Sequence, residues 1–162
     1  MMIRRLVTAA ALLALLAPPA LAMRLGATYL PTGADAQVVA VTAEGAADAG
    51  VTVLTQAVAV NESGPKATVK RFGEVYAFAP AFVAVHRDQP TQISFWNLQP
   101  DDQHDFMLAD ARAHVLMHVA LPPLKETAYV FTFHQEGLFT FYCTMHQPEM
   151  SGQILVLPPL AR

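Results

Sequence analysis

Apolar and polar residues alternate along most of the chain in short runs, which is the pattern of β-strands. In residues 128–133, Ala-Tyr-Val-Phe-Thr-Phe, the three aromatic rings occupy every second position and share one face of an extended chain. Similar runs recur between breaks rich in Pro, Gly, Asp and Gln. No stretch after the first 22 residues shows a helical period. The predicted strands are 37–42, 51–60, 67–72, 74–78, 82–86, 92–96, 105–108, 113–119, 127–133, 138–143 and 152–157.

Short strands separated at regular intervals by turns are typical of an all-β sandwich. The clearest break is Asn-Glu-Ser-Gly-Pro at 61–65, which combines turn residues with one that cannot continue a strand ladder. We therefore predict a main domain over residues 66–162. Residues 23–65 are expected to form an N-terminal arm and a pair of strands, 37–42 with 51–60, that adds to the sandwich or lies over one of its edges.

The first 22 residues have the features of a secretory signal peptide. Arg4 and Arg5 precede an apolar run at 6–16, and Ala-Leu-Ala at 20–22 is a small-x-small cleavage site. The apolar run is shorter than the roughly 20 residues of a membrane-spanning helix. We expect export to the periplasm, cleavage near Ala22 and no membrane span afterwards.

The charge of the chain argues against some classes of partner. The sequence is 54% apolar and 14% charged, with a formal net charge of −3. Removing the leader takes two arginines, so eight basic residues face thirteen acidic ones and the charge becomes −5. A mildly acidic protein is not expected to bind nucleic acid or anionic lipid, and its charge is compatible with a basic protein partner.

One segment places a thiol, an imidazole and a thioether within eight residues. Cys143 is the sole cysteine, and His146 and Met150 follow it in a Pro-containing loop between the runs 138–143 and 152–157. Because the second run must return beside the first, the loop is expected to turn all three side chains toward one point.

A thiolate, two imidazoles and a weak thioether form the ligand set of mononuclear copper sites, whereas thioether is a poor ligand for zinc. His104 is the best candidate for the second imidazole, because it starts a strand after the polar break 97–103.

The stretch from residue 72 to 159 resembles the cupredoxins. The points of resemblance are Phe-Ala-Pro-Ala-Phe-Val-Ala-Val at 78–85, Gln-His-Asp-Phe at 103–106 and Gly-Leu-Phe-Thr-Phe-Tyr-Cys at 137–143. The resemblance implies a Greek-key β-sandwich that holds one copper ion, cycling between Cu(I) and Cu(II). The implied ligands are the imidazoles of His104 and His146, the thiolate of Cys143 and the axial Met150.

The sequence departs from the cupredoxin pattern at two places. Three residues separate His146 from Met150, where familiar members have two or four. Met150 is therefore the least secure of the four ligands, and Glu149 or a backbone oxygen is an alternative at the axial position. Asp105 follows His104 where many relatives carry an asparagine, which leaves the hydrogen bonding around the thiolate open.

Electron transfer to a redox partner protein, such as a cytochrome, is the function that these features favour, and no catalytic motif is present. Asp101, Asp102 and Asp105 bracket His104 and could steer a basic partner, although solvated loop charges are the commoner explanation. A thiol hydrolase with Cys143 as nucleophile is disfavoured, because catalytic pairs normally come from distant segments.

The alternative function is copper sequestration or delivery to a copper acceptor through the same ligands. Additional Met and His residues outside the site would favour this alternative. His114, Met117 and His118 are a small group of this kind. For His114 and His118 we expect an exposed pair rather than a second copper site.

Overall fold

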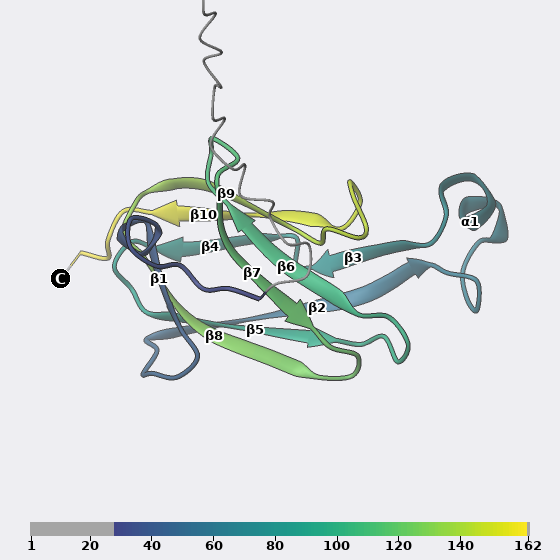
Figure 1. Ribbon diagram of the computed structural model, residues 1–162, viewed down its shortest axis with the longest axis horizontal. Helices are drawn as coiled ribbons and strands as arrows, with labels where there is room; N and C mark the ends of the chain where they lie inside the picture. The colour runs from purple at the N-terminus through teal and green to yellow at the C-terminus, as the bar shows by residue number, and fades with distance from the viewer. Residues whose placement is uncertain (1–27, 162) are drawn as a thin grey trace, which may run out of the picture.

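The structure is a computed structural model that describes residues 28–161 (Figure 1). Ten strands form two five-stranded sheets packed as a sandwich. The predicted signal peptide at 1–22 lies outside the described residues. Between residues 28 and 161, no helix has the length and apolarity that crossing a membrane requires.

The sheets are mixed, with one parallel pair in each. The first sheet contains, in spatial order, β1 (Val39–Thr42), β8 (Glu126–Phe133), β5 (Thr91–Asn97), β2 (Ala49–Ala59) and β3 (Val75–Ala79). The second contains β4 (Phe82–His86), β10 (Ser151–Leu157), β9 (Gly137–Tyr142), β6 (His104–Ala109) and β7 (Val115–Leu121). The parallel pairs are β2 with β5 and β4 with β10. A 3-10 turn, η1 (Asp35–Gln37), and one helix, α1 (Lys66–Phe72), complete the elements.

The all-β sandwich predicted from the alternating pattern is confirmed, and the observed strand bounds lie within about two residues of the expected ones. One predicted strand is wrong, because residues 67–72 form helix α1. None of the residues of α1 is buried, so this segment has no core that would hold it as a strand. Ala, Lys and Arg favour a helix, and Gly73 ends it with a φ of 81°, which other residues rarely adopt.

The expected pairing of the two N-terminal strands with each other is also wrong. β1 is an edge strand that pairs with β8, whereas β2 lies inside the same sheet between β5 and β3. The register of β2 is fixed by its parallel neighbour β5, which comes later in the chain. Residues before the break at 61–65 therefore supply an interior strand of the sandwich.

Aromatic side chains fill the interior between the sheets. The stripe predicted in β8 is confirmed, since Phe131 and Phe133 are buried and Tyr129 packs against the core from its edge. Paired rings, one from each sheet, contribute packing contacts beyond their buried area. The cross-sheet pairs are Phe95 with Phe106 at 4.4 Å between centroids, Phe133 with Phe139 at 5.0 Å, and Phe78 with Phe141 at 5.3 Å.

Gly152, in β10, lies where the two sheet neighbours leave no room for a side chain. A Cβ atom there would be 2.3 Å from Cζ of Phe141 and 2.5 Å from the carbonyl oxygen of Ala81, which already accepts a hydrogen bond from the Gln153 amide. We expect Gly152→Ala to lower the free energy of unfolding by about 1–3 kcal/mol in urea titrations, because the crowded neighbours must move. Gly50→Ala is the control, since nothing lies within 4 Å of its Cβ position; equal effects of the two changes would contradict this explanation.

Candidate metal centre

His104 is the first residue of β6, and a buried amide holds the loop before it. Asn97 ends β5 and donates through Nδ2 to the carbonyl oxygens of Asp102, at 2.8 Å, and Leu121, at 2.9 Å. Its Oδ1 accepts a bond of 2.8 Å from the Thr55 hydroxyl of β2. The amide thus joins three strands and fixes the backbone two residues before His104, whose side chain is fully buried.

The loop from Cys143 to Met150 connects β9 to β10 and closes on itself. The amide of Cys143 donates to the carbonyl of Met150 at 2.9 Å, and the amide of Met150 donates to the carbonyl of His146 at 2.9 Å. Gln147 Nε2 also donates to the carbonyl of Cys143 at 3.1 Å. Because β10 pairs antiparallel with β9, the loop returns as expected and directs Cys143 and His146 to one point.

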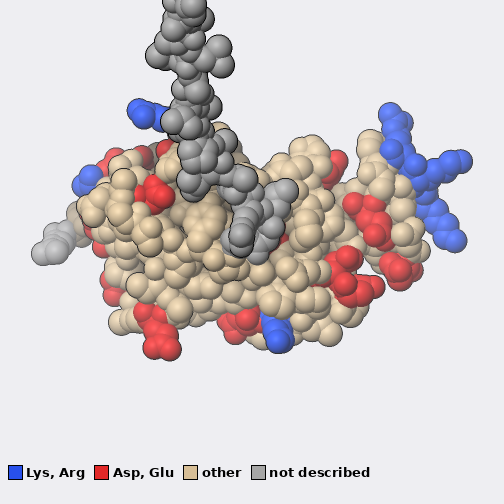
Figure 2. Space-filling view, in the orientation of Figure 1, with Lys and Arg blue, Asp and Glu red and all other residues tan. Residues whose placement is uncertain are grey.

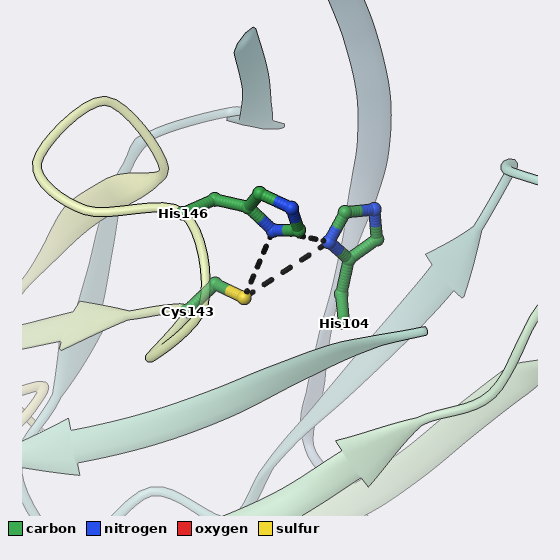
Figure 3. Close-up of side chains that lie close together, drawn as sticks. All are labelled: His104, Cys143 and His146. Atoms are coloured by element: carbon green, nitrogen blue, oxygen red, sulfur yellow. Dashed lines mark hydrogen bonds between the residues drawn. The ribbon is translucent and has the colours of Figure 1, made fainter. Parts of the chain in front are cut away.

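Three donor atoms from the two segments meet at this end of the sandwich (Figure 3). Nδ1 of His104 lies 3.1 Å from Nδ1 of His146, and Cys143 Sγ lies 3.5 Å from the second nitrogen and 3.9 Å from the first. Within residues 28–161, these side chains form the one group of three His, Cys, Asp or Glu residues suited to a metal ion.

The separations suit a single metal ion. Bonds of about 2.0–2.1 Å to nitrogen and about 2.3 Å to sulfur, at angles between tetrahedral and trigonal, place ligand atoms roughly 3.3–3.8 Å apart. The observed values of 3.1, 3.5 and 3.9 Å lie around that range. A thiolate with two imidazoles is a donor set for copper or zinc. The residues present therefore fit the metal expected from the sequence.

Met150 is fully buried in the same loop, whereas Glu149 is exposed. The backbone bonds of Met150 to both Cys143 and His146 hold it beside the donors. Burial thus favours the thioether over the Glu149 carboxylate as the fourth, axial contact. The ligand role of Met150 stays a prediction.

Tyr76 of β3 packs on both imidazoles, a role that the sequence did not indicate. Its ring centroid lies 4.8 Å from that of His104 and 4.5 Å from that of His146, and the side chain is 2% exposed. Its hydroxyl donates a hydrogen bond to Asp102. Alternation in β3 indicates that Tyr76 is buried, but only the packing of the two sheets places it over the donors.

Asp105 ties the two ligand segments together. Its Oδ1 accepts a bond of 2.6 Å from the Thr144 amide, and its Oδ2 accepts one from the Thr144 hydroxyl. The carboxylate is buried, which acts to raise its pKa, but the hydrogen bonds from Thr144 and His118 outweigh burial and lower the pKa. An ionised carboxylate therefore fixes the residue after Cys143 to the residue after His104.

The expected exposed pair, His114 and His118, is wrong for His118. His118 is buried in β7, and its Nε2 donates to Asp105 Oδ2 at 2.9 Å. His114 lies just before β7, which begins at Val115, and there it is exposed and lies 3.6 Å from Asp35. His118 thus belongs to the hydrogen-bond network behind Cys143 and not to a second surface site.

Burial controls the protonation of the three donors in the metal-free protein. Burial, reinforced by the nearby His146, lowers the pKa of His104 to about 4, and burial lowers the pKa of His146. Burial raises the pKa of the Cys143 thiol to about 11, although the backbone amides of Asp105 and Met145 donate to the sulfur and oppose the rise. At neutral pH the imidazoles are neutral and the thiol keeps the one proton that a metal must displace.

Comparison with known proteins relates this fold to copper proteins. No family model matches the sequence, and no curated protein matches it significantly. Among solved structures, auracyanin B aligns with a TM-score of 0.52 at 14% identity, over 71% of this chain and 93% of its own. A multicopper oxidase also aligns with a TM-score of 0.52 at 14% identity, over 70% of this chain and 45% of its own.

A multicopper oxidase from Campylobacter jejuni has a TM-score of 0.52 at 10% identity, over 70% of this chain and 31% of its own. The chain thus spans nearly all of auracyanin B and less than half of the oxidases. The likeness in each case is one of fold. This chain therefore has a cupredoxin-like β-sandwich fold, which is the fold that the resemblance in its sequence implies.

Proposed function

We propose that this protein transfers single electrons through one copper ion held by His104, Cys143 and His146, with Met150 as a weak axial ligand. The observation that carries the proposal is the convergence of two imidazole nitrogens and a sulfur from distant segments, within 4.8 Å of one another. Bound copper would supply a one-electron couple between Cu(I) and Cu(II).

The surroundings of the donor atoms support an electron-transfer site rather than a catalytic site. Tyr76, Asp105 and Asn97 hold the ligand segments from both sheets, so the donor positions should change little between oxidation states. His104 is buried and His146 is half-buried, which leaves the His146 edge as the approach for an electron partner. Met145, 52% exposed beside it, adds an apolar contact.

A thiol hydrolase receives no support from the site. A nucleophilic cysteine needs an accessible thiolate with a lowered pKa. The sulfur of Cys143 is fully buried, and burial raises its pKa to about 11. We therefore propose that the protein is not an enzyme.

We further propose that the protein works in the periplasm after removal of the predicted signal peptide. The support is the arginine-led apolar leader at 1–22. In an oxidising compartment the lone Cys143 is protected from forming intermolecular disulfides by its burial and by the metal.

Copper titration of the purified protein tests the proposal. We expect one equivalent of Cu(II) to produce a strong sulfur-to-copper charge-transfer band and a one-copper paramagnetic resonance signal. Stopped-flow mixing with a small reductant should then show fast, reversible reduction. Absence of the band at one equivalent of copper would refute the site.

The same sample separates electron transfer from copper sequestration or delivery. A relay retains its copper against a Cu(I) chelator through many redox cycles, whereas a carrier releases it. Of the three additional residues that would favour a carrier, Met117 and His118 are buried and only His114 is exposed. Rapid loss of copper to the chelator, with slow redox exchange, would favour the carrier instead.

The buried carboxylate of Asp105 is expected to lower the reduction potential. Its negative charge lies one residue from His104 and is bonded to Thr144, so it stabilises the more positive oxidised metal. In cyclic voltammetry of the copper-loaded protein, Asp105→Asn should raise the potential by on the order of 50–100 mV, or about 1–2 kcal/mol. Asp101→Asn, an exposed change nearby, should shift it much less; a fall in the Asp105 variant would contradict the electrostatic argument.

A further inference from the structure

The basic residues of this acidic protein are concentrated on α1. Six of the ten Lys and Arg residues lie within residues 28–161, together with all thirteen acidic ones. Three of those six are on the helix: Lys66, Lys70 and Arg71. All three are exposed, and inside the described range no carboxylate forms an ion pair with them. Figure 2 shows them as a group projecting from one end of the molecule.

Helix α1 stands at the tip of an arm that extends beyond the sandwich (Figure 1). This α1 arm consists of the end of β2, α1 and the start of β3. Thr55 of β2 lies opposite Asn97, where β5 ends, but β2 continues to Ala59 before the chain turns into α1. No residue of α1 is buried. A helix of seven residues that buries nothing contributes little to the stability of its own fold, so its surface is available for a partner.

The arm offers apolar contacts as well as charge. Phe72 is 61% exposed with the Arg71 guanidinium 5.2 Å from its ring centroid, and Val58 of β2 is 54% exposed. A groove of about 290 Å³ lies between the helix and the end of β2, lined by Val60, Asn61, Lys66, Val69 and Lys70. Two lysines at such a groove suit a carboxylate side chain.

The arm is attached directly beside the donors. Phe72 lies only four positions before Tyr76, an extended span of at most about 14 Å, and Tyr76 packs on both His104 and His146. The Asn61 amide and side chain both donate to the Glu74 carboxylate, at 2.9 and 2.8 Å, which closes the base of the arm. A protein bound to α1 is therefore held next to the His146 edge.

We propose that the α1 arm is the docking surface for the electron-exchange partner, a protein with an acidic surface around its redox centre. This inference rests on the proposed function and names the partner's charge. It differs from the basic partner expected from Asp101, Asp102 and Asp105. Of these carboxylates, Asp105 is buried and Asp102 is bonded to Tyr76, so only Asp101 is fully exposed.

A protein partner fits this surface better than an anionic membrane does. Each basic residue contributes only about 1 kcal/mol at a charged bilayer, and the described part of the chain carries seven more acidic than basic residues. Glu62 and Glu74 on the same arm would face the lipid as well. A protein surface can match both the cations and these neighbouring carboxylates.

Stopped-flow reduction of the copper-loaded protein tests the proposal, with an acidic plant-type ferredoxin and a basic mitochondrial cytochrome c as the two donors. We expect the triple variant Lys66→Gln, Lys70→Gln, Arg71→Gln to react with ferredoxin about tenfold more slowly at low ionic strength, with a weaker salt dependence. Its visible spectrum and its reduction potential should be unchanged, and its rate of reaction with cytochrome c should not fall.

Single charge reversals provide the matched control. Lys70→Glu should slow the ferredoxin reaction several-fold, whereas Arg112→Glu, an exposed change at the opposite end of β6, should have little effect. An unchanged ferredoxin rate in the triple variant, or equal effects of the two reversals, would overturn the docking surface while leaving the copper site intact. Failure of electron exchange with both donors would overturn the proposed function itself.

Two further measurements test the other possible occupants of the α1 arm, an anionic membrane and a second copy of this chain. Wild-type protein that sediments with phosphatidylglycerol vesicles, and loses this binding in the triple variant, would show a lipid surface instead of a protein partner. A concentration-dependent mass in ultracentrifugation that the triple variant abolishes would show a second copy of this chain. We expect neither behaviour at physiological salt.

Discussion

Replacing Cys143 with serine is expected to lower the affinity for copper by at least about a thousandfold, or roughly 4 kcal/mol, and to remove the intense visible absorption. The sulfur is the one soft donor among the three atoms that meet at the site. A hydroxyl in its place keeps the size of the group but offers neither a thiolate bond nor a sulfur-to-metal transition. Competition with a calibrated chelator measures the affinity.

The same variant should lose a pH dependence that the wild-type protein has. Burial raises the pKa of the Cys143 thiol to about 11, so the free thiol is protonated below that pH and the metal must displace the proton. Wild-type affinity should therefore rise about tenfold per pH unit between pH 6 and 8, with about one proton released per copper. The pKa of His104 is lowered to about 4, so His104 adds no slope here, and burial also lowers the pKa of His146, which reduces its contribution.

Met145→Leu is the control for both measurements, because Met145 is exposed in the same loop. It should keep the band, the affinity and the slope. A Cys143→Ser protein that retained the band, or a wild-type affinity independent of pH between 6 and 8, would contradict the assignment of the thiolate ligand.

Asn97→Ala is expected to lower the free energy of unfolding by about 2–4 kcal/mol. The amide is fully buried and makes bonds to Thr55, Asp102 and Leu121, so its removal leaves polar groups without partners and creates a cavity. Because Asp102 lies two residues before His104, we also expect weaker copper binding. Urea titration of the metal-free protein measures the first effect and chelator competition the second.

Asn61→Ala is the matched control for Asn97→Ala. Asn61 also hydrogen-bonds through its side-chain amide, to Glu74, but in an exposed position. Its loss should change stability by no more than about 0.5 kcal/mol. Equal losses in the two variants would rule out the structural role assigned to the buried amide.

The sequence was informative where short-range pattern decides the structure. Alternation predicted the strands of the sandwich, and the spacing of Cys143 and His146 identified a loop that needs only one β-hairpin to assemble. His104 required a further inference, that strand ends meet at one end of a sandwich. The structure brings these three side chains together.

The features that the sequence did not reveal depend on contacts between distant elements. β2 pairs in parallel with β5, which no local pattern encodes, and so the expected pairing of β1 with β2 is wrong. Residues 67–72 were expected to form a strand, but without a core to cover they follow their helix propensity. Tyr76 and His118 look like ordinary strand residues until the sheets bring them to the donors.

The position of Tyr76 has a consequence for how the two layers stay together. The three donors belong to the sheet of β6 and β9, whereas Tyr76 covers them from the sheet of β3, so the ion would sit at the seam of the sandwich. A ligand that binds the folded state and not the unfolded chain stabilises the fold by mass action. Copper would therefore protect the contact between Tyr76 and the donor sheet, and the copper-loaded protein should unfold at a higher urea concentration than the metal-free protein.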